Sequence, residues 1–269
     1  MRRFVPYVMT FFSFLTMPAF AETRTICTLV ADANRAQTLV KEGDCTQRMS
    51  PASTFKIAIS LMGFDADILT SPSVPELPFR EGYIDWRPEW KQSTSPSRWM
   101  KYSVVWYSQQ ITRRLGEERY KAYVEKFGYG NQDVSGDPDK ANGLTNAWLS
   151  SSLQISPVGQ VEFLRKLVGR KLPVSEAAVS NTAKILDYGR QASGWQLYGK
   201  TGAGLPRGAN GQLVKGRPFG WFVGWAQRDG RTVIFARLIQ DNERQPSPPG
   251  FRARDGLIAD LFGKQSPLN

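Results

Sequence analysis

A serine and a lysine three residues apart, Ser53 and Lys56, open an apolar run near the start of the chain. Three residues are close to one helical turn, so the two side chains would share one face of a helix. A serine hydroxyl attacks poorly until a base takes its proton, and this chain of 269 residues contains no histidine. Lys56 can act as that base if burial lowers its pKa far below that of a free lysine, or if it is chemically modified.

Two later stretches extend this chemistry. Ser103-Val104-Val105 stands at the start of a helical run, and Lys200-Thr201-Gly202 stands at the end of a β-prone run. The Ser103 hydroxyl could pass a proton to a leaving nitrogen, while the Lys200 cation could hold a carboxylate. Each stretch also has an ordinary interpretation. Ser53 or Ser103 would then cap a helix, Lys56 would be solvated, and residues 200–202 would be a plain strand exit.

Hydrophobic periodicity indicates the elements that must position these groups. A hairpin is expected over 25–40, with the Ser53 helix after it and an irregular, proline-punctuated connection over 67–96. Further helices are expected over 104–115, 117–127, 157–168, 175–185 and 251–262, and strands over 195–201, 220–226 and 232–240. Strands at both ends with helices between them predict an α/β (α+β) fold. Its central antiparallel sheet is built from both termini, is flanked by helices and has a mainly helical lobe inserted.

The first 21 residues are typical of a secretory signal. Arg2 and Arg3 precede an apolar stretch, and Ala19-Phe20-Ala21 supplies small residues for cleavage. Interruption by prolines disfavours an uncleaved membrane anchor. A single domain over 22–269 is therefore expected, with a sheet lobe over about 22–52 and 190–269 and a helical lobe over about 53–189.

Charge and cysteine content bound the partners and the compartment. The net charge is +11, but the basic residues are interspersed with acidic ones, which argues against a nucleic-acid partner. Cys27 and Cys45 flank the expected hairpin, and an oxidising compartment favours a disulfide between them, although two free thiols remain an alternative. Closing that loop would contribute about 3 kcal/mol. Without histidine, a zinc site is not expected.

Ser-x-x-Lys, a serine triplet and Lys-Thr-Gly, in this order, form the pattern of penicillin-recognising serine enzymes. Over nearly its whole mature length the chain resembles a class D β-lactamase, an oxacillinase. The motifs that carry the resemblance are Ser53-Thr54-Phe55-Lys56, Ser103-Val104-Val105, Tyr129-Gly130-Asn131, Trp148 in Trp148-Leu149-Ser150, Lys200-Thr201-Gly202 and Gly220-Trp221-Phe222-Val223-Gly224-Trp225.

The resemblance implies the fold of the penicillin-recognising serine transferases and a two-step hydrolysis of β-lactams. Ser53 would form the acyl-enzyme, and Lys56, carboxylated on its side-chain nitrogen by carbon dioxide or bicarbonate, would be the general base of both steps. Trp148 would stabilise that modified lysine, and Ser103 would relay a proton. The amide groups of Ser53 and Ala203 would form the oxyanion hole. No metal or organic cofactor is implied.

Substrate binding is also assigned by resemblance. The residues expected around the β-lactam are Val105, Lys200, Thr201, Gly202 and an arginine at the start of the last helix. Arg252 is favoured for this role, although Arg254 is close enough that a small shift in alignment would exchange the two. The expected enzyme acts in the periplasm as a monomer or homodimer, without nucleic acid and without a membrane once the signal is removed.

Two other functions remain possible from the sequence. A penicillin-binding receptor or peptidase would use the same motifs but would release its acyl group slowly. A basic periplasmic binding protein would have no catalysis, and Ser53 would never form an adduct with a penicillin. Turnover separates the first from a β-lactamase, and covalent labelling of Ser53 separates the second.

Overall fold

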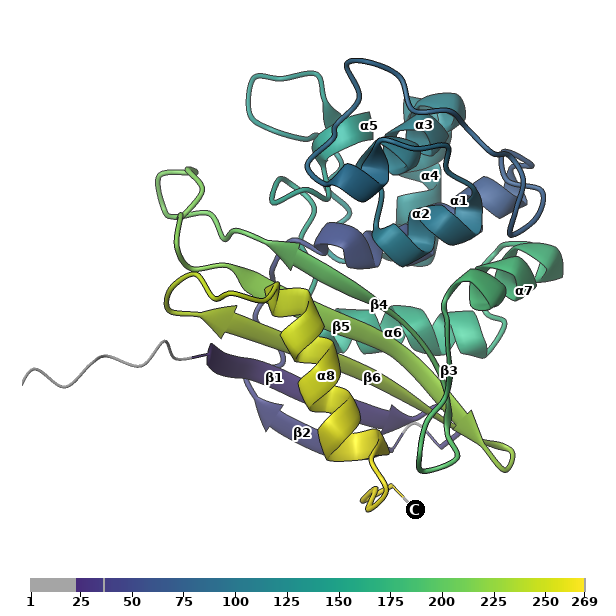
Figure 1. The fold of residues 1–269 in the computed structure, drawn as a ribbon, viewed down its shortest axis with the longest axis vertical. Coiled ribbons are helices and arrows are strands. Elements are labelled where there is room, and N and C mark those ends of the chain that lie inside the picture. Colours follow the sequence, from purple (N-terminus) through teal and green to yellow (C-terminus); the bar gives the residue numbers. More distant parts are fainter. Residues whose placement is uncertain (1–22, 36, 269) are drawn as a thin grey trace, which may run out of the picture.

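A computed structural model describes residues 23–35 and 37–268, so the signal expected over 1–21 lies outside the described part. In that part the strands form one six-stranded sheet in the order β2-β1-β6-β5-β4-β3, and every neighbouring pair is antiparallel (Figure 1). The strands are β1 (Thr23–Asp32), β2 (Thr38–Gly43), β3 (Asp187–Arg190), β4 (Gln196–Gly204), β5 (Phe219–Arg228) and β6 (Arg231–Asp241). The expected fold class is confirmed.

The sheet joins the two ends of the chain. Strand β1 lies between β2 and β6, with Thr23 opposite Asp241 and Asp32 opposite Val233. The tight turn at Asp229 and Gly230 links β5 to β6, and both residues have positive φ, as such a turn requires. The centre of the sheet therefore depends on residues more than 200 positions apart.

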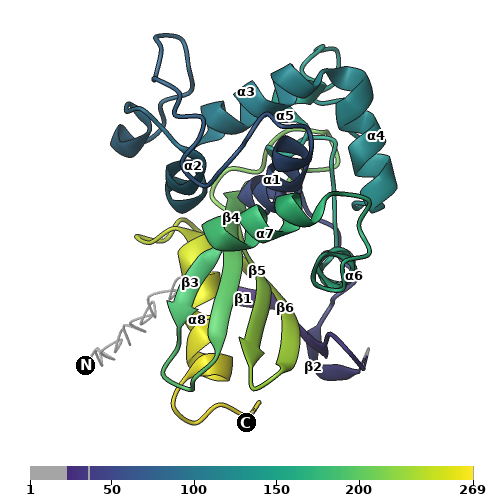
Figure 2. The ribbon, with the colours of Figure 1, turned by 90° about the vertical axis from the view of Figure 1, so that its right-hand side faces the viewer.

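The central strands bury both of their faces. Along β5, Trp221 and Val223 belong to the core shared with the helical region, while Phe222 between them belongs to the core beneath α8 (Pro249–Phe262). This alternation follows from the two-residue period of a strand. Helix α8 covers one face of the sheet, and Figure 2 shows the other helices on the opposite side and beyond the sheet's end.

The helical region lies between β2 and β3 in the chain. Its elements are η1 (Ala52–Phe55), α1 (Lys56–Asp65), η2 (Pro88–Trp90), α2 (Pro96–Tyr102), α3 (Val105–Leu115), α4 (Glu117–Phe127), α5 (Gly143–Asn146), α6 (Pro157–Val168) and α7 (Glu176–Ile185). Helix α1 is its centre, and nine of its ten residues are buried. It packs against α7, α3 and α4.

Some elements depart from the sequence-based expectation. Helix α2 and strand β3 were not expected, because the first begins at Pro96, the last residue of the proline-rich connection, and the second is only four residues long. Helix α6 was placed in the helical lobe, yet it packs against β6 and β1. The helices and strands that had been expected from periodicity are present, with bounds that differ by a few residues.

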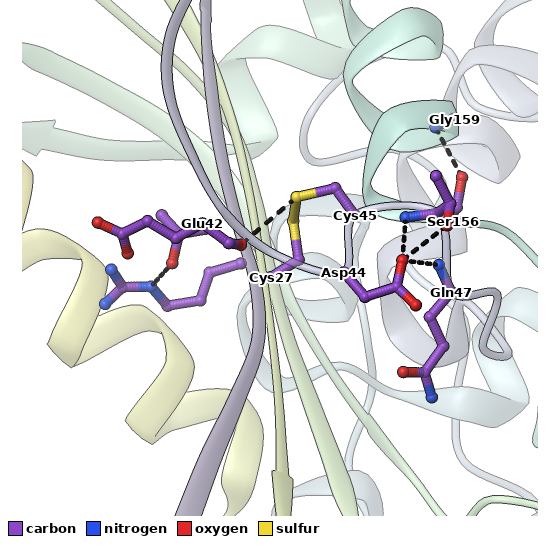
Figure 3. Close-up of a disulfide and its surroundings, with 10 residues drawn as sticks. Cys27, Glu42, Asp44, Cys45, Gln47, Ser156 and Gly159 are labelled. Carbon is purple, nitrogen blue, oxygen red and sulfur yellow. Dashed lines mark hydrogen bonds between the residues drawn. A yellow bond between two sulfur atoms is a disulfide. The ribbon is translucent and has the colours of Figure 1, made fainter.

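A disulfide ties the N-terminal strand to the segment that leads to Ser53. Figure 3 shows Cys27 on β1 bonded to Cys45, with a Cα–Cα distance of 5.0 Å and both residues buried. The carbonyl of Cys45 also accepts a hydrogen bond from Val158 N, in the first turn of α6, at 3.2 Å. The cross-link therefore fixes the turn between the sheet and the helical region.

Candidate active site

Ser53 lies in the short 3-10 turn η1, directly before helix α1, and Lys56 is the first residue of that helix. The Lys56 side-chain nitrogen Nζ donates to Ser53 Oγ at 3.2 Å. Ala52, which precedes the serine, has φ +49, a conformation that side chains other than glycine seldom adopt. The expected pairing of a serine with a lysine on one face is therefore present.

Lys56 is fully buried. Burial places its pKa well below the ordinary lysine value, and the positive charges of Lys200 and Arg87 lower it further. Among the residues that the structure describes, no carboxylate forms an ion pair with Lys56. Burial thus shifts this side chain toward the neutral amine, and its nitrogen stands within hydrogen-bonding distance of a serine hydroxyl.

Strand β4 brings the third group to the same place. Gly202 passes so close to η1 that a Cβ there would meet Pro51 O at 2.9 Å and Thr54 N at 3.2 Å. Two residues earlier, Lys200 is buried and its Nζ donates to Thr201 O at 3.1 Å. Burial, with the charges of Arg87 and Arg254, lowers the pKa of Lys200 to about 7.

Ser103 enters from the opposite side. It ends helix α2 in the left-handed conformation, with φ +59, and Val104 rather than Ser103 is the N-cap of α3. The alternative interpretation of Ser103 as a helix N-cap is therefore wrong. Its Oγ is buried and has no hydrogen-bond partner among the described residues. An unpartnered hydroxyl in a strained turn is free to bond to a ligand.

Ser53 and Ser103 line one cleft of about 120 Å³, whereas Lys56 and Lys200 are not part of its lining. Its walls include Ser53, Ser103, Val105, Thr201, Gly202 and Ala203, which come from η1, α3, β4 and the turn after α2. The cleft therefore unites stretches that are about 50 and 100 residues apart in the chain.

The two candidate arginines have different surroundings. Arg252 is engaged by Asp241, a fully buried carboxylate, through two hydrogen bonds, and it also donates to Thr23 Oγ1 at 2.6 Å. Arg254 instead lines a cavity together with Lys200 and Thr201. Its guanidinium lies 4.9 Å from the ring centre of Phe251. The preference for Arg252 therefore does not fit its position, because its donors are already used within the fold.

Comparison with known proteins gives the family. The sequence model described as the penicillin-binding protein transpeptidase domain matches residues 21–260. Beta-lactamase OXA-9 of Klebsiella pneumoniae is 47% identical over 236 residues, which are 87% of this chain and 86% of that protein. Beta-lactamase OXA-1 of Escherichia coli is 39% identical over 253 residues, 93% of this chain and 88% of that protein.

A solved structure leads to the same family. The crystal structure of OXA-427 class D β-lactamase superposes with a TM-score of 0.83 at 47% identity, covering 87% of this chain and 95% of that one. The chain belongs to the class D serine β-lactamases. The expected family and activity class are thus confirmed, and the enzyme is a hydrolase of β-lactams.

Trp148 is buried within this β-lactamase beside Phe55, with ring centres 5.8 Å apart. Its indole nitrogen Nε1 has no hydrogen-bond partner among the described residues. Its carbonyl oxygen accepts from Ser50 Oγ at 2.7 Å, so the segment is anchored three residues before Ser53. A buried N–H left without an acceptor is costly unless another group takes it.

Sequence reasoning missed part of the cleft wall. Trp86, Arg87 and Trp90 come from the proline-rich connection, and Phe251 comes from the start of α8. The signal available in the sequence was the pair of tryptophans, Trp86 and Trp90, in that connection. In the structure their rings lie 5.7 Å apart and Trp86 is 68% exposed. Nothing in the sequence linked Arg87 to the site.

The described residues of this β-lactamase contain no group of three or more cysteine, aspartate or glutamate side chains arranged to hold a metal ion. Within the same residues, no helix is both long enough and apolar enough to cross a membrane.

Proposed function

We propose that Ser53 is the nucleophile of this β-lactamase and that Lys56 is its general base. The observation that carries the proposal is the 3.2 Å contact between Lys56 Nζ and Ser53 Oγ at a fully buried lysine without a paired carboxylate. A neutral amine in this position can accept the serine proton directly. It is also the form that reacts with carbon dioxide.

Carboxylation of Lys56 would supply a negatively charged base that serves both acylation and deacylation. Two buried donors without partners among the described residues, Trp148 Nε1 and Ser103 Oγ, support this proposal, because an added carboxylate group offers the acceptors that they lack. Carbon dioxide or bicarbonate is then the one small molecule that the enzyme needs besides substrate and water.

The remaining residues bind and orient the β-lactam. Lys200, Thr201 and Arg254 would hold its carboxylate, because a guanidinium and an ammonium line the same cavity wall. The amide groups of Ser53 and Ala203 would bind the carbonyl oxygen, and Gly202 allows β4 to approach the nucleophile. Ser103 would pass a proton to the leaving nitrogen, and Val105 would contact the substrate.

We also propose that residues 1–21 are a signal removed near Ala21 and that the mature enzyme works in the periplasm, as a monomer or homodimer. A disulfide between Cys27 and Cys45 fits an oxidising compartment.

The test follows hydrolysis of a chromogenic β-lactam, first in buffer stripped of carbon dioxide and then with bicarbonate restored. We expect multiple turnovers whose rate rises when bicarbonate returns. A stoichiometric burst that does not respond to bicarbonate would instead indicate a penicillin-binding receptor with Lys56 as a plain amine. Absence of any adduct at Ser53, judged by mass spectrometry, would exclude it as the nucleophile.

A further inference from the structure

The cleft at Ser53 shares one wall with a larger cavity of about 700 Å³. Arg87, Thr201 and Phe251 line both spaces. The larger space extends past Lys200, toward α2, the end of α7 and strand β3. It therefore begins where the substrate carboxylate is proposed to bind and leads away from the nucleophile.

Positive charge dominates this cavity. Its lining includes five basic residues, against the two acidic residues Glu89 and Asp187: Arg87, Lys101, Lys184, Lys200 and Arg254. Asp187 is already engaged, since its Oδ1 accepts from Gly189 N at 2.7 Å and from Gln196 Nε2. The cavity thus has a net excess of cationic groups.

Arg87 stands at the boundary between the two spaces. Among the described residues its guanidinium group forms no ion pair and no hydrogen bond, whereas Arg254 Nε donates to Asp255 Oδ1 at 2.7 Å. Its charge acts on both buried lysines, lowering the pKa of Lys56 and that of Lys200. Arg87 is therefore a cation directed at the site without an internal partner.

The cavity also has aromatic walls. Tyr188, Tyr102 and Phe251 line it, and Tyr188 and Phe251 are each more than a third exposed. Exposed aromatic rings beside an excess of cations suit a flat, negatively charged group, because rings stack on its face while the cations bind its charge.

The ring of a cephalosporin carries a variable substituent on the carbon next to the one that bears the carboxylate. With the carboxylate at Lys200, Thr201 and Arg254, that substituent would enter the larger cavity. We propose that this cavity is a subsite for an anionic heteroaromatic substituent next to the substrate carboxylate, and that Arg87 determines the preference for it. The proposal rests on the carboxylate site of the proposed function.

The experiment compares two competitors of chromogenic β-lactam hydrolysis that share a mandelamido side chain. They differ only in the tetrazole substituent of the C3 group, which is methyl in cefamandole and sulfomethyl in cefonicid. The readout is the ratio of their inhibition constants, because a general change at the carboxylate site affects both compounds and cancels. Inhibition also reports binding when a competitor is turned over slowly.

We expect the wild type to bind the sulfomethyl compound more tightly, and Arg87→Met to reduce that preference about tenfold. Arg87→Lys should keep most of the preference for the sulfomethyl compound, and this preference should weaken as salt is added. Lys121→Met, which removes a cation paired with Glu125 on α4, is the control and should leave the ratio unchanged.

An equal affinity of the wild type for the two compounds, or an unchanged ratio in Arg87→Met, would overturn the subsite. Hydrolysis of the chromogenic substrate would persist in either case. Failure of the subsite proposal is therefore distinguishable from failure of the proposed function. If the proposed function were wrong, hydrolysis of the chromogenic substrate would not depend on Ser53.

Discussion

At the scale of single residues, the site is defined by polar groups that the fold buries without satisfying. Lys56 has no counter-charge, and Trp148 Nε1 and Ser103 Oγ have no acceptor among the described residues. Each is costly to keep in that state unless a ligand or a modification completes it.

Trp148→Phe keeps an aromatic ring in the core and removes only the indole N–H. We expect the bicarbonate concentration that gives half-maximal activity to rise about tenfold, because the carboxylated lysine loses a buried donor. Activity titrated against bicarbonate measures this shift. Trp195→Phe is the control, since Trp195 has an equally buried and unpartnered indole N–H between α8 and the sheet. Equal responses of the two variants would contradict the role given to Trp148.

Arg254→Ala and Arg252→Ala separate the two arginines. Loss of Arg254 should raise KM about tenfold for a substrate with a carboxylate, because a charge-assisted bond is lost. Loss of Arg252 should instead destabilise the fold by about 3–5 kcal/mol, because it leaves Asp241 buried and unpaired. Steady-state kinetics and urea unfolding of both variants give the answer. If Arg252→Ala instead raised KM and Arg254→Ala instead destabilised the fold, Arg252 would be the carboxylate binder.

Lys200 predicts how catalysis depends on pH. Its pKa is lowered to about 7, so the free enzyme loses this cation as the pH rises through 7. We expect kcat/KM for an anionic β-lactam to fall on the alkaline side with an apparent pKa near 7. Lys200→Arg keeps the charge at all these pH values and should flatten that limb.

The effect of Lys200 on folding stability changes with pH in the opposite direction to its effect on kcat/KM. The unfolded chain binds this proton up to the ordinary lysine pKa, and the folded chain releases it near 7. The contribution of Lys200 to stability therefore increases as the pH rises from about 7 to about 10.

The kinetic prediction for Lys200 has its own contradicting outcome. If the alkaline limb of kcat/KM is identical in the wild type and in Lys200→Arg, that limb belongs to another group.

Single-residue roles were only partly predictable from the sequence. The spacing of Ser53 and Lys56 predicted their contact, because three residues make nearly one helical turn. The choice between Arg252 and Arg254 was not predictable, since both stand early in one helix. It depends on Asp241, a residue of β6 that the sequence does not mark as a partner.

At the scale of elements, a network joins the loop after β4 to the segment that carries Trp148. Arg207 donates to Ser150 O at 2.7 Å and to Asp137 Oδ1 at 2.6 Å. Asp137 also accepts from Ser151 Oγ at 2.8 Å and from Asn142 Nδ2 at 3.0 Å. One arginine thus connects three irregular segments around the site.

A double-mutant cycle measures this connection. Arg207→Ala and Asp137→Ala should each destabilise the protein, and the double variant should lose little more than either single one. We expect a coupling on the order of 1 kcal/mol, read from urea unfolding. Additive losses would mean that the two side chains act independently.

Long elements were predictable from periodicity, whereas short ones were not. Buried alternating strands such as β5 and amphipathic helices such as α3 leave a clear pattern over ten or more residues. Strand β3 spans four residues, and α2 begins at Pro96 within a connection rich in prolines. The wall of the cleft near Arg87 lies in that connection, so it had no periodic signal.

At the scale of the whole molecule, the disulfide joins the sheet to the turn before the nucleophile. Replacing Cys27 and Cys45 together by alanine should lower the free energy of unfolding by about 3 kcal/mol, mainly because the unfolded chain gains freedom. Urea unfolding of the variant and of the reduced wild type should give similar losses. Equal stability of all three forms would mean that the cross-link adds nothing to the fold.

Strand β6 is central to the sheet but is synthesised late. Ribosomes release a chain from its first residue to its last, and β6 begins at Arg231, within the final fifth of the sequence. Until it arrives, β1 has no inner neighbour and β5 has an open edge. A growing chain can therefore already contain Ser53, Lys56 and Lys200 and still be inert. The enzyme should become active in one late step, when the C-terminal strand β6 pairs with the N-terminal strand β1 and completes the sheet.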